Sequence, residues 1–229
     1  MKAMFHWARK NDVLECIPNI DAISKDRVVH KEKYTFNKKQ IGKLLSTADV
    51  KMKAMIWLGL NCGFGCTDCS RLQWKDLDFK NNRVKLARNK TKIGRNLPLW
   101  PETIQALKEI PRSGALVFTT SKGHPWIRTR ATTNDNGESK YTVDNQITTR
   151  FSRLMKKVGI QAPKGTGFYT FRRTAATIAA RSGDPFAVQR LLGHVDLTMA
   201  TRYVQDVSEQ TDRVIENSRK HFIGKEDVA

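Results

Sequence analysis

Apolar residues recur at helical spacing near the start of the chain and then give way to a polar stretch. From Ala3 to Glu15 they stand three or four positions apart, as at Met4, Trp7 and Ala8, which predicts a helix. Residues 17–33 are polar and basic without a period, as is typical of a linker. We therefore expect residues 1–33 to be the end of a preceding domain and its linker.

A compact, mainly helical region is predicted to follow. Thr35 or Asn37 can cap a first helix, and the near-continuous apolar content of residues 52–62 predicts a buried second one. Asp144 or Asn145 can cap a later helix that stops near Gly159. The other expected elements are helices over residues 101–110, 170–183 and 185–194, and a loop over residues 121–141. The fold class is mainly α with a small inserted antiparallel β-sheet.

That sheet is predicted from two β-like runs, residues 83–88 and 95–100, around the turn NKTKIG. Lys80 to Arg95 contains seven basic residues and no acidic one. The hairpin tip is either a solvated surface or a face for DNA phosphates. The candidate DNA-binding residues are Lys85, Arg88, Lys92, Arg95 and, on a later helix, Arg173.

The charge of the whole chain favours a polyanionic partner. Its 229 residues include 41 Lys and Arg against 22 Asp and Glu, a formal net charge of +19. Basic side chains that contact phosphates release condensed counterions, so nucleic acid is favoured over a generic basic protein. No apolar run reaches the ~20 residues of a membrane span. A membrane-surface partner is not expected either, because no helix combines a basic face with an exposed Trp/Phe/Leu face. The N-terminus has no signal-peptide pattern, which predicts a cytoplasmic location and reduced thiols.

The stretch NCGFGCTDCSRL, residues 61–72, holds three of the four cysteines. A phosphate-binding loop would need a longer glycine-rich run that ends in Lys. A zinc site would need four ligands, and Cys62, Cys66 and Cys69 supply three. Their spacing also fits one buried helical stripe, so no metal site is predicted.

Four residues further along the chain suit chemistry on one phosphate. A tyrosine hydroxyl such as that of Tyr203 is a weak nucleophile, which needs cations to balance the phosphorane and a proton donor for the leaving oxygen. Lys90 in the hairpin turn, Arg172 on a helix and His194 after a helix stop are candidates for these tasks. Each residue alone would more often be structural or solvated.

Their order and spacing resemble the C-terminal signature of the tyrosine recombinases, the phage integrase family. The stretch YTFRRTAATIAARSGDPFAVQRLLGHVDLTMATRYV carries a helix start, a Leu-Gly-His turn and a tyrosine nine residues after the histidine. NKTKIGRNLPL resembles the family's lysine turn, and CGFGCTDCSRLQWKDLD the segment with its first arginine. The resemblance implies a remnant of an N-terminal core-binding domain with its linker (residues 1–33), a catalytic domain (34–204) and a tail helix (205–229).

The resemblance also implies a role for each candidate. Tyr203 would attack the scissile phosphate to give a 3′-phosphotyrosyl bond, and Lys90 would protonate the leaving 5′ oxygen. Arg172 and His194 would hold the non-bridging oxygens. No cofactor is implied. The implied partner is double-stranded DNA. The protein is expected to form a homo-tetramer only when it is bound to DNA. The possible subunit contacts are Val207, Val214, Ile215 and Phe222. A bacterial or phage-encoded, nucleoid-associated protein is expected.

Two positions depart from the family pattern. Tyr169 stands where the family has a histidine, and as a catalytic residue it would still hydrogen-bond a phosphate oxygen. Gly65 stands where the family has its first arginine. Two hypotheses remain open: a working recombinase with a rearranged site, or a DNA-binding relative that does not cleave. Arg71, Arg173 and Lys53 are the cations considered as replacements for the missing guanidinium.

Overall fold

The computed structural model describes residues 2–16, 34–133, 139–180, 184–197 and 215. The chain divides into two compact units, Met1–Glu32 and Lys33–Ala229, which we describe separately. In the first unit, α1 spans Lys2–Lys10. The predicted helix to Glu15 is too long, because Asp12 adopts a positive φ of 55° that ends the helical path. No described helix is long and apolar enough to cross a bilayer.

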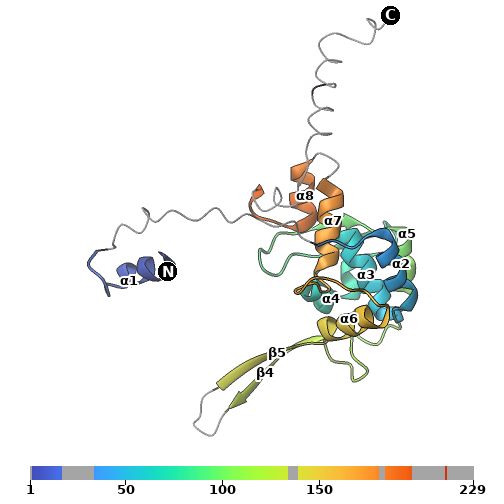
Figure 1. The fold of residues 1–229 in the computed structure, drawn as a ribbon, viewed down its shortest axis with the longest axis horizontal. Helices are drawn as coiled ribbons and strands as arrows, with labels where there is room; N and C mark the ends of the chain where they lie inside the picture. Colours follow the sequence, from blue (N-terminus) through green and yellow to red (C-terminus); the bar gives the residue numbers. More distant parts are fainter. Residues whose placement is uncertain (1, 17–33, 134–138, 181–183, 198–214, 216–229) are drawn as a thin grey trace, which may run out of the picture. The chain divides into compact units, whose positions relative to one another are not determined.

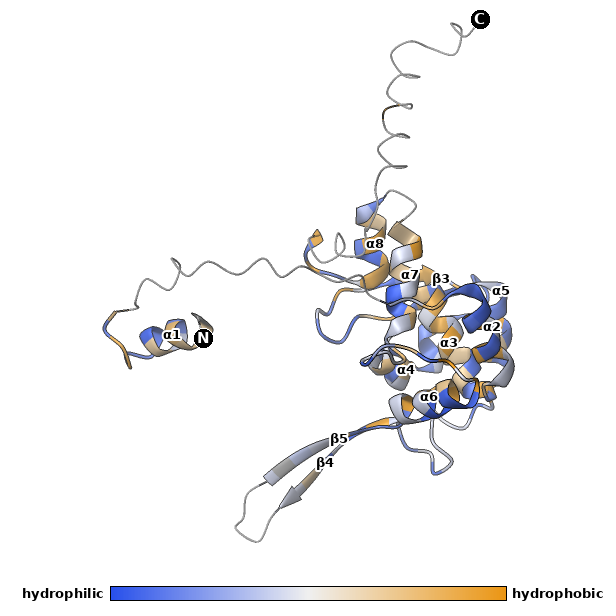
Figure 2. Ribbon diagram, viewed as in Figure 1, coloured by the Kyte–Doolittle hydropathy of each residue, from blue (hydrophilic) through white to orange (hydrophobic). Residues whose placement is uncertain are grey.

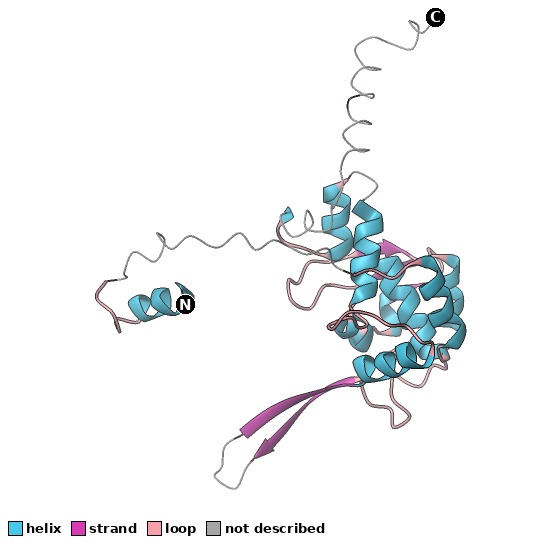
Figure 3. Cartoon of the chain, viewed as in Figure 1, coloured by secondary structure: helices cyan, strands magenta, loops and turns pink. Residues whose placement is uncertain are grey.

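The second unit is mainly helical with small antiparallel sheets, so the predicted fold class is confirmed (Figures 1 and 3). Its helices are α2 (Lys38–Thr47), α3 (Val50–Cys62), α4 (Cys66–Arg71), the 3₁₀ turn η1 (Trp74–Asp76), α5 (Pro101–Lys108), α6 (Gln146–Lys157), α7 (Thr170–Ala180) and α8 (Pro185–Leu192). Its strands are β1 (Leu77–Asp78), β2 (Arg83–Lys85), β3 (Asn96–Pro98), β4 (Ile127–Thr133) and β5 (Ser139–Asn145).

Helix α3 is the centre of the core and packs against α5 and α7. Its predicted buried character is confirmed, since Met55, Ile56 and Leu58 are fully buried. Asn37 caps the preceding helix α2 through a capping box with Gln40, as predicted. In Figure 2 α2 is mainly blue, in keeping with a surface helix that buries only one residue fully.

An aromatic cluster fixes α6 and α7 against this core. Phe151 of α6 contacts Phe36, Phe168 and Phe171, with ring centroids 5.2–6.0 Å apart at steep angles. Such edge-to-face pairs add to the stabilisation that comes from buried area. Asn145 caps α6, and Gly159 follows it with a positive φ of 68°, so both predicted ends are confirmed. The cluster sets where α7 begins.

The predicted hairpin is present. Strands β1, β2 and β3 form an antiparallel sheet in that order, and Val84 pairs with Leu77 on one side and Leu97 on the other. Val84 is almost fully buried, whereas the neighbouring Lys85 is exposed. This alternation anchors the sheet on the core and leaves the turn of residues 89–92 outside it.

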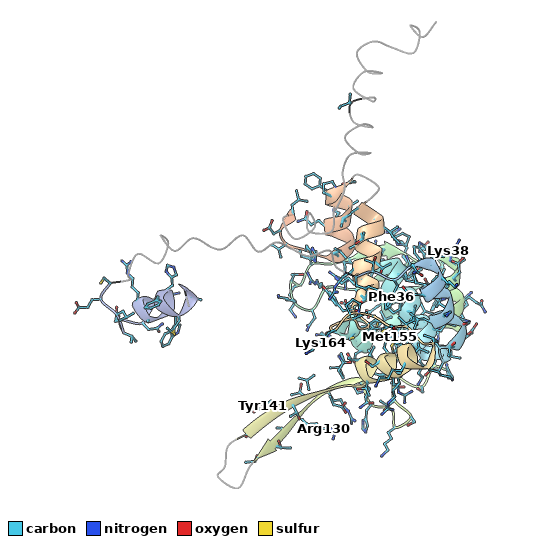
Figure 4. All side chains as sticks on the ribbon, in the orientation of Figure 1. Phe36, Lys38, Arg130, Tyr141, Met155 and Lys164 are labelled. Carbon is cyan, nitrogen blue, oxygen red and sulfur yellow. The ribbon has the colours of Figure 1, made fainter. Side chains whose placement is uncertain are left out.

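The prediction of a loop over residues 121–141 is wrong. Strands β4 and β5 pair along their whole length, from Ile127 with Asn145 to Thr133 with Ser139. The hairpin projects from the helical part of the unit, and its side chains Arg130 and Tyr141 lie out on it (Figures 1 and 4). Residues 129–133 and Tyr141 to Val143 are exposed, so neither face has the run of buried apolar residues from which a strand is predicted.

Helices α7 and α8 pack side by side (Figure 1). Asp184 caps α8, and Gly193 ends it in the left-handed region with φ 59°. Of the tail residues expected to make subunit contacts, only Ile215 belongs to the part that the structure describes, and it is 63% exposed. Val207, Val214, Phe222 and Tyr203 lie outside the described residues.

Candidate active site

The stretch with three cysteines forms a sharp turn between two helices. Gly63 ends α3 in the left-handed region, with φ 61°, where a side chain would be strained. Gly65 is the extended N-cap residue of α4, and its backbone N–H donates to Asp68 Oδ2 at 3.0 Å. The position predicted to have lost an arginine therefore lies at the start of α4.

A cleft of about 250 Å³ opens beside this turn. Its walls come from α4, the β2–β3 hairpin turn and the start of α7, which are distant in sequence. The lining residues are Gly65, Cys66, Thr67, Asp68, Arg88, Asn89, Lys90, Tyr169 and Arg172. The cleft thus brings together three of the predicted catalytic residues, the degenerate position and one predicted DNA-binding residue.

Arg172 is the most constrained residue of the cleft. It is only 1% exposed, and its Nη1 donates to the carbonyl of Gly63 at 2.7 Å. Its Nη2 donates to the carbonyl of Leu192 and lies 3.3 Å from Nε2 of His194. These carbonyls end α3 and α8, where helix dipoles favour a cation. Burial lowers the pKa of Arg172 from its usual value. The guanidinium therefore holds two helix ends together.

His194 lies just after the end of α8 and is 5% exposed. Burial, followed by the nearby charges of Arg172 and Arg88, lowers its pKa to about 4. The imidazole is therefore neutral at pH 7. Since an arginine only donates, Nε2 must be the acceptor from Arg172, and we assign the ring proton to Nδ1.

The titration of His194 should be visible by NMR. We expect its ring to titrate at about pH 4 in the folded protein, against about 6.5 in an unfolded chain. Because the folded pKa is the lower one, the contribution of His194 to stability is complete above pH 6.5 and is lost as the pH falls towards 4. If His194 titrated near pH 6.5 in the folded protein, its ring would not be buried beside Arg172 as the structure shows. In Arg172→Met the pKa should rise.

The two departures from the family pattern lie next to each other. A β-carbon at residue 65 would lie 3.6 Å from Cδ2 of Tyr169, an ordinary contact distance. Tyr169 is 43% exposed at the start of α7 and lines the cleft beside Lys90, which is exposed in the hairpin turn. The Tyr169 ring therefore lies over the backbone where an arginine side chain would begin.

None of the three cations considered as replacements lines the cleft. Arg71 donates to Oδ1 of Asn89. Arg173 stacks on the Tyr169 ring, with its guanidinium carbon 5.8 Å from the centroid. Lys53 lines a different groove, between α3 and α5.

One predicted DNA contact needs correction. Arg95 is not on the surface of the hairpin: its side chain is fully buried, and Nη2 forms an ion pair with Oδ1 of Asp68 at 2.7 Å. Its guanidinium also lies over the Phe64 ring at 4.7 Å. Arg95 therefore stabilises α4 through a buried ion pair with Asp68. Lys85 and Lys92 are exposed, as a DNA-facing role requires, and Arg88 is half-buried in the cleft.

The cysteines do not form the predicted single stripe, because Gly63 to Gly65 separates two helices. Cys62 ends α3, while Cys66 and Cys69 belong to α4. Burial raises the pKa of Cys62 to about 12, raises that of Cys66, and raises that of Cys69 well above the usual value. These thiols are therefore protonated. Within the described ranges, no group of three or more His, Cys, Asp or Glu residues is arranged to hold a metal ion.

Sequence reasoning missed Asp68 and did not place Arg88, which it predicted only as a DNA contact, within the cleft. Asp68 stands three residues after Gly65, the spacing of a helix-capping carboxylate, and this signal was available. Arg88 stands two residues before Lys90, but its place in the cleft depends on how the hairpin docks on Gly193. No local pattern predicts that docking.

The fold is shared with several solved structures. XerA recombinase, 18% identical with a TM-score of 0.61, aligns over 83% of this chain and 66% of its own. The Tn1549 transposon integrase in complex with transposon right-end DNA, 20% identical with a TM-score of 0.66, aligns over 97% and 76%. A lambda integrase dimer bound to a COC′ core site, 16% identical with a TM-score of 0.60, aligns over 89% and 56%.

The family follows from the sequence itself. A sequence model of the Phage integrase family matches residues 34–210, which is more than half of the chain. The protein therefore belongs to the Phage integrase family. A search of curated proteins found no match. The chain spans 66% of the length of XerA and 56% of that of lambda integrase.

Proposed function

We propose that this protein is a DNA-binding site-specific recombinase, which cleaves and rejoins DNA strands through a 3′-phosphotyrosyl intermediate. The observation that carries the proposal is the cleft in which Lys90, Tyr169 and Arg172 meet, with His194 in contact with Arg172. Three separate chain segments line the cleft, and His194 brings a fourth into contact with Arg172. Membership of the Phage integrase family supports the same chemistry.

The proposed reaction conserves one phosphodiester bond. The Tyr203 hydroxyl releases its proton to water as its oxygen attacks the scissile phosphorus. The bond to the 5′ oxygen breaks, and Lys90 gives that oxygen a proton. Arg172 balances the charge that develops on the non-bridging oxygens, and we assign His194, beside the Arg172 guanidinium, to the same group. Tyr169 adds a hydroxyl at the cleft edge. The free 5′ hydroxyl of a second strand then reverses the steps, so no cofactor is needed.

Double-stranded DNA is the proposed partner. The formal net charge of +19 supports it, as do the solved Tn1549 and lambda integrase complexes with DNA. We further propose that residues 34–204 are the catalytic domain, that residues 1–33 end a core-binding domain, and that residues 205–229 form a tail helix that contacts a neighbour in a tetramer on DNA. A nucleoid-associated, cytoplasmic location goes with this role.

Gly65 favours a second candidate function. Without the first arginine, the cleft lacks a cation that the family's reaction uses, and Tyr169 covers that position. The alternative is therefore a DNA-binding protein of this family that no longer cleaves. It keeps the DNA partner and loses the covalent step.

A covalent trapping experiment separates the two functions. Bound sequences are first selected from a random DNA library, and a nicked duplex of the selected site is then incubated with the protein. A recombinase is expected to give an SDS-resistant protein–DNA adduct that Tyr203→Phe abolishes without loss of DNA binding. Tight binding with no adduct in the unaltered protein would contradict the recombinase proposal and support the binding-only function.

Binding should depend strongly on salt through the exposed hairpin lysines. Each lost phosphate contact lowers the slope of log affinity against log salt by about 0.9, so neutralising Lys85 and Lys92 should lower it by about 1.8. Lys38→Gln with Lys39→Gln is the matched control, because these exposed lysines of α2 lie outside the cleft. An equal change in both double variants would mean that the hairpin is not the DNA-facing surface.

A further inference from the structure

We propose that Arg88 supplies the guanidinium that the position of Gly65 lacks. This inference rests on the proposed function, since it assigns a phosphate-binding role within the same cleft. Arg88 is the second fixed arginine of the cleft lining, beside Arg172. It was predicted as a general DNA contact, and its position gives it a more specific task.

Two hydrogen bonds fix the part of the hairpin that carries Arg88. Its Nη1 donates to the carbonyl of Gly193 at 3.1 Å, and the hydroxyl of Thr91 donates to the same carbonyl at 2.9 Å. Gly193 directly precedes His194. A β-carbon at Gly193 would approach the Arg88 side chain to 3.3 Å, so glycine permits this close docking. Arg88 is therefore held against the residue next to one proposed phosphate ligand.

The backbone of the hairpin turn adds to this order. Arg88 N–H donates to the Ile93 carbonyl at 2.9 Å, and Lys92 N–H donates to the Arg88 carbonyl at 2.8 Å. Lys90 lies within the turn that these bonds close. One hydrogen-bonded turn thus carries both Arg88 and the proposed proton donor into the cleft, as preorganised transition-state binding requires.

The charge of Arg88 is also available. Within the part of the chain that the structure describes, Arg88 forms no ion pair with a carboxylate, whereas the charge of Arg95 is balanced by Asp68. The field of Arg88 reaches the other members of the site, since it lowers the pKa of both Arg172 and His194. Two like-charged guanidinium groups held close together favour an anion between them.

The other cations are less suited to this role. Arg71 is exposed and bonded to Asn89, and Arg173 lies on the ring of Tyr169. Lys53 lies in the α3–α5 groove, outside the cleft. Arg88 already lines the cleft, whereas each of the other three side chains would have to move to reach it.

Anion binding tests the proposal without any cleavage. In the ¹⁵N-labelled full chain, inorganic phosphate should shift the backbone amides of Gly65 and Thr67, which line the cleft. Arg88→Gln should weaken this binding by about tenfold to a hundredfold, since a charge-assisted hydrogen bond is lost. Lys85→Gln, which removes an exposed hairpin charge, is expected to change it by less than about twofold.

A second control separates binding from docking. Thr91→Val removes the other bond to the Gly193 carbonyl but keeps the guanidinium, so phosphate affinity should fall less than in Arg88→Gln. If Arg88→Gln binds phosphate as tightly as the unaltered protein, or if phosphate shifts neither Gly65 nor Thr67, the proposal is overturned. An equal loss in Thr91→Val and Arg88→Gln would also overturn it, because Arg88 would then act only by docking the turn.

Adduct formation extends the test to the reaction. At saturating DNA, Arg88→Gln should slow the adduct by about 10²-fold. Adding Gly65→Arg to that variant should restore much of the rate, because the guanidinium returns from another position. A failure of rescue would mean that Arg88 does not substitute for the missing arginine. If the unaltered protein forms no adduct, the proposed function fails, and the phosphate titration still decides the role of Arg88.

Discussion

Gly65→Arg is expected to raise the rate of covalent adduct formation by about 10-fold to 10²-fold. One preorganised donor to a transition state is typically worth about 10²–10³ in rate, and Arg88 already supplies part of that stabilisation in our proposal. The backbone of residue 65 is extended, with φ −96°, so an arginine is not strained there. The rate is measured with a nicked duplex at saturating protein, in single turnover.

The Tyr169 ring decides how far the new side chain can reach. The β-carbon would meet Tyr169 at 3.6 Å and Oδ2 of Asp68 at 3.9 Å, so both must be accommodated. A guanidinium stacks well on an aromatic face, and in this pose it would point along the ring rather than at the phosphate. We therefore expect Gly65→Arg combined with Tyr169→His to exceed Gly65→Arg alone.

Two controls isolate the guanidinium. Gly65→Ala changes the N-cap residue without adding a charge and should cost about 1 kcal/mol of stability at most, with no gain in rate. Tyr203→Phe in each background should abolish the adduct. If the unaltered protein forms the adduct readily and Gly65→Arg does not raise the rate, the prediction is wrong. The site would then already hold every cation that the reaction needs, as expected if Arg88 replaces the arginine fully.

Local sequence rules predicted the helices because their ends carry explicit signals. Asn37, Asn145 and Gly193 each satisfy or end a helix through their own chemistry, so position in sequence is enough. The β4–β5 hairpin lacks such a signal. Residues 129–133 of β4 and Tyr141 to Val143 of β5 are exposed, and only the pairing of Arg130 with Thr142 and its neighbours shows that they are strands.

The residues of the site that could be predicted are those identified by their order and spacing along the sequence. The resemblance led to Lys90, Arg172 and His194, and the structure places Lys90 and Arg172 in one cleft with His194 beside Arg172. Arg88 and Arg95 could not be told apart, because both belong to one basic hairpin. Which arginine turns inward depends on Asp68 and Gly193, from two other segments. Tertiary docking therefore decides their roles.

Arg172→Met is expected to lower the free energy of unfolding by about 3 kcal/mol and to remove the adduct. The substitution leaves the carbonyls of Gly63 and Leu192 buried without their charged donor, and each such loss typically costs about 1–3 kcal/mol. Methionine fills part of the space, which offsets some of that cost. The unfolding free energy is measured by urea denaturation of the full chain.

Arg173→Met is the matched control for this effect. Arg173 is the next residue of the same helix, is half-buried, and contacts the Tyr169 ring rather than a buried carbonyl. Its loss should change stability by about 0.5 kcal/mol or less. Arg172→Lys should lie between the two, since an ammonium cannot donate to both helix ends in the planar arrangement of a guanidinium. Equal stability in Arg172→Met and Arg173→Met would mean that Arg172 does not join α3 to α8. The role of Arg172 would then be limited to binding the phosphate.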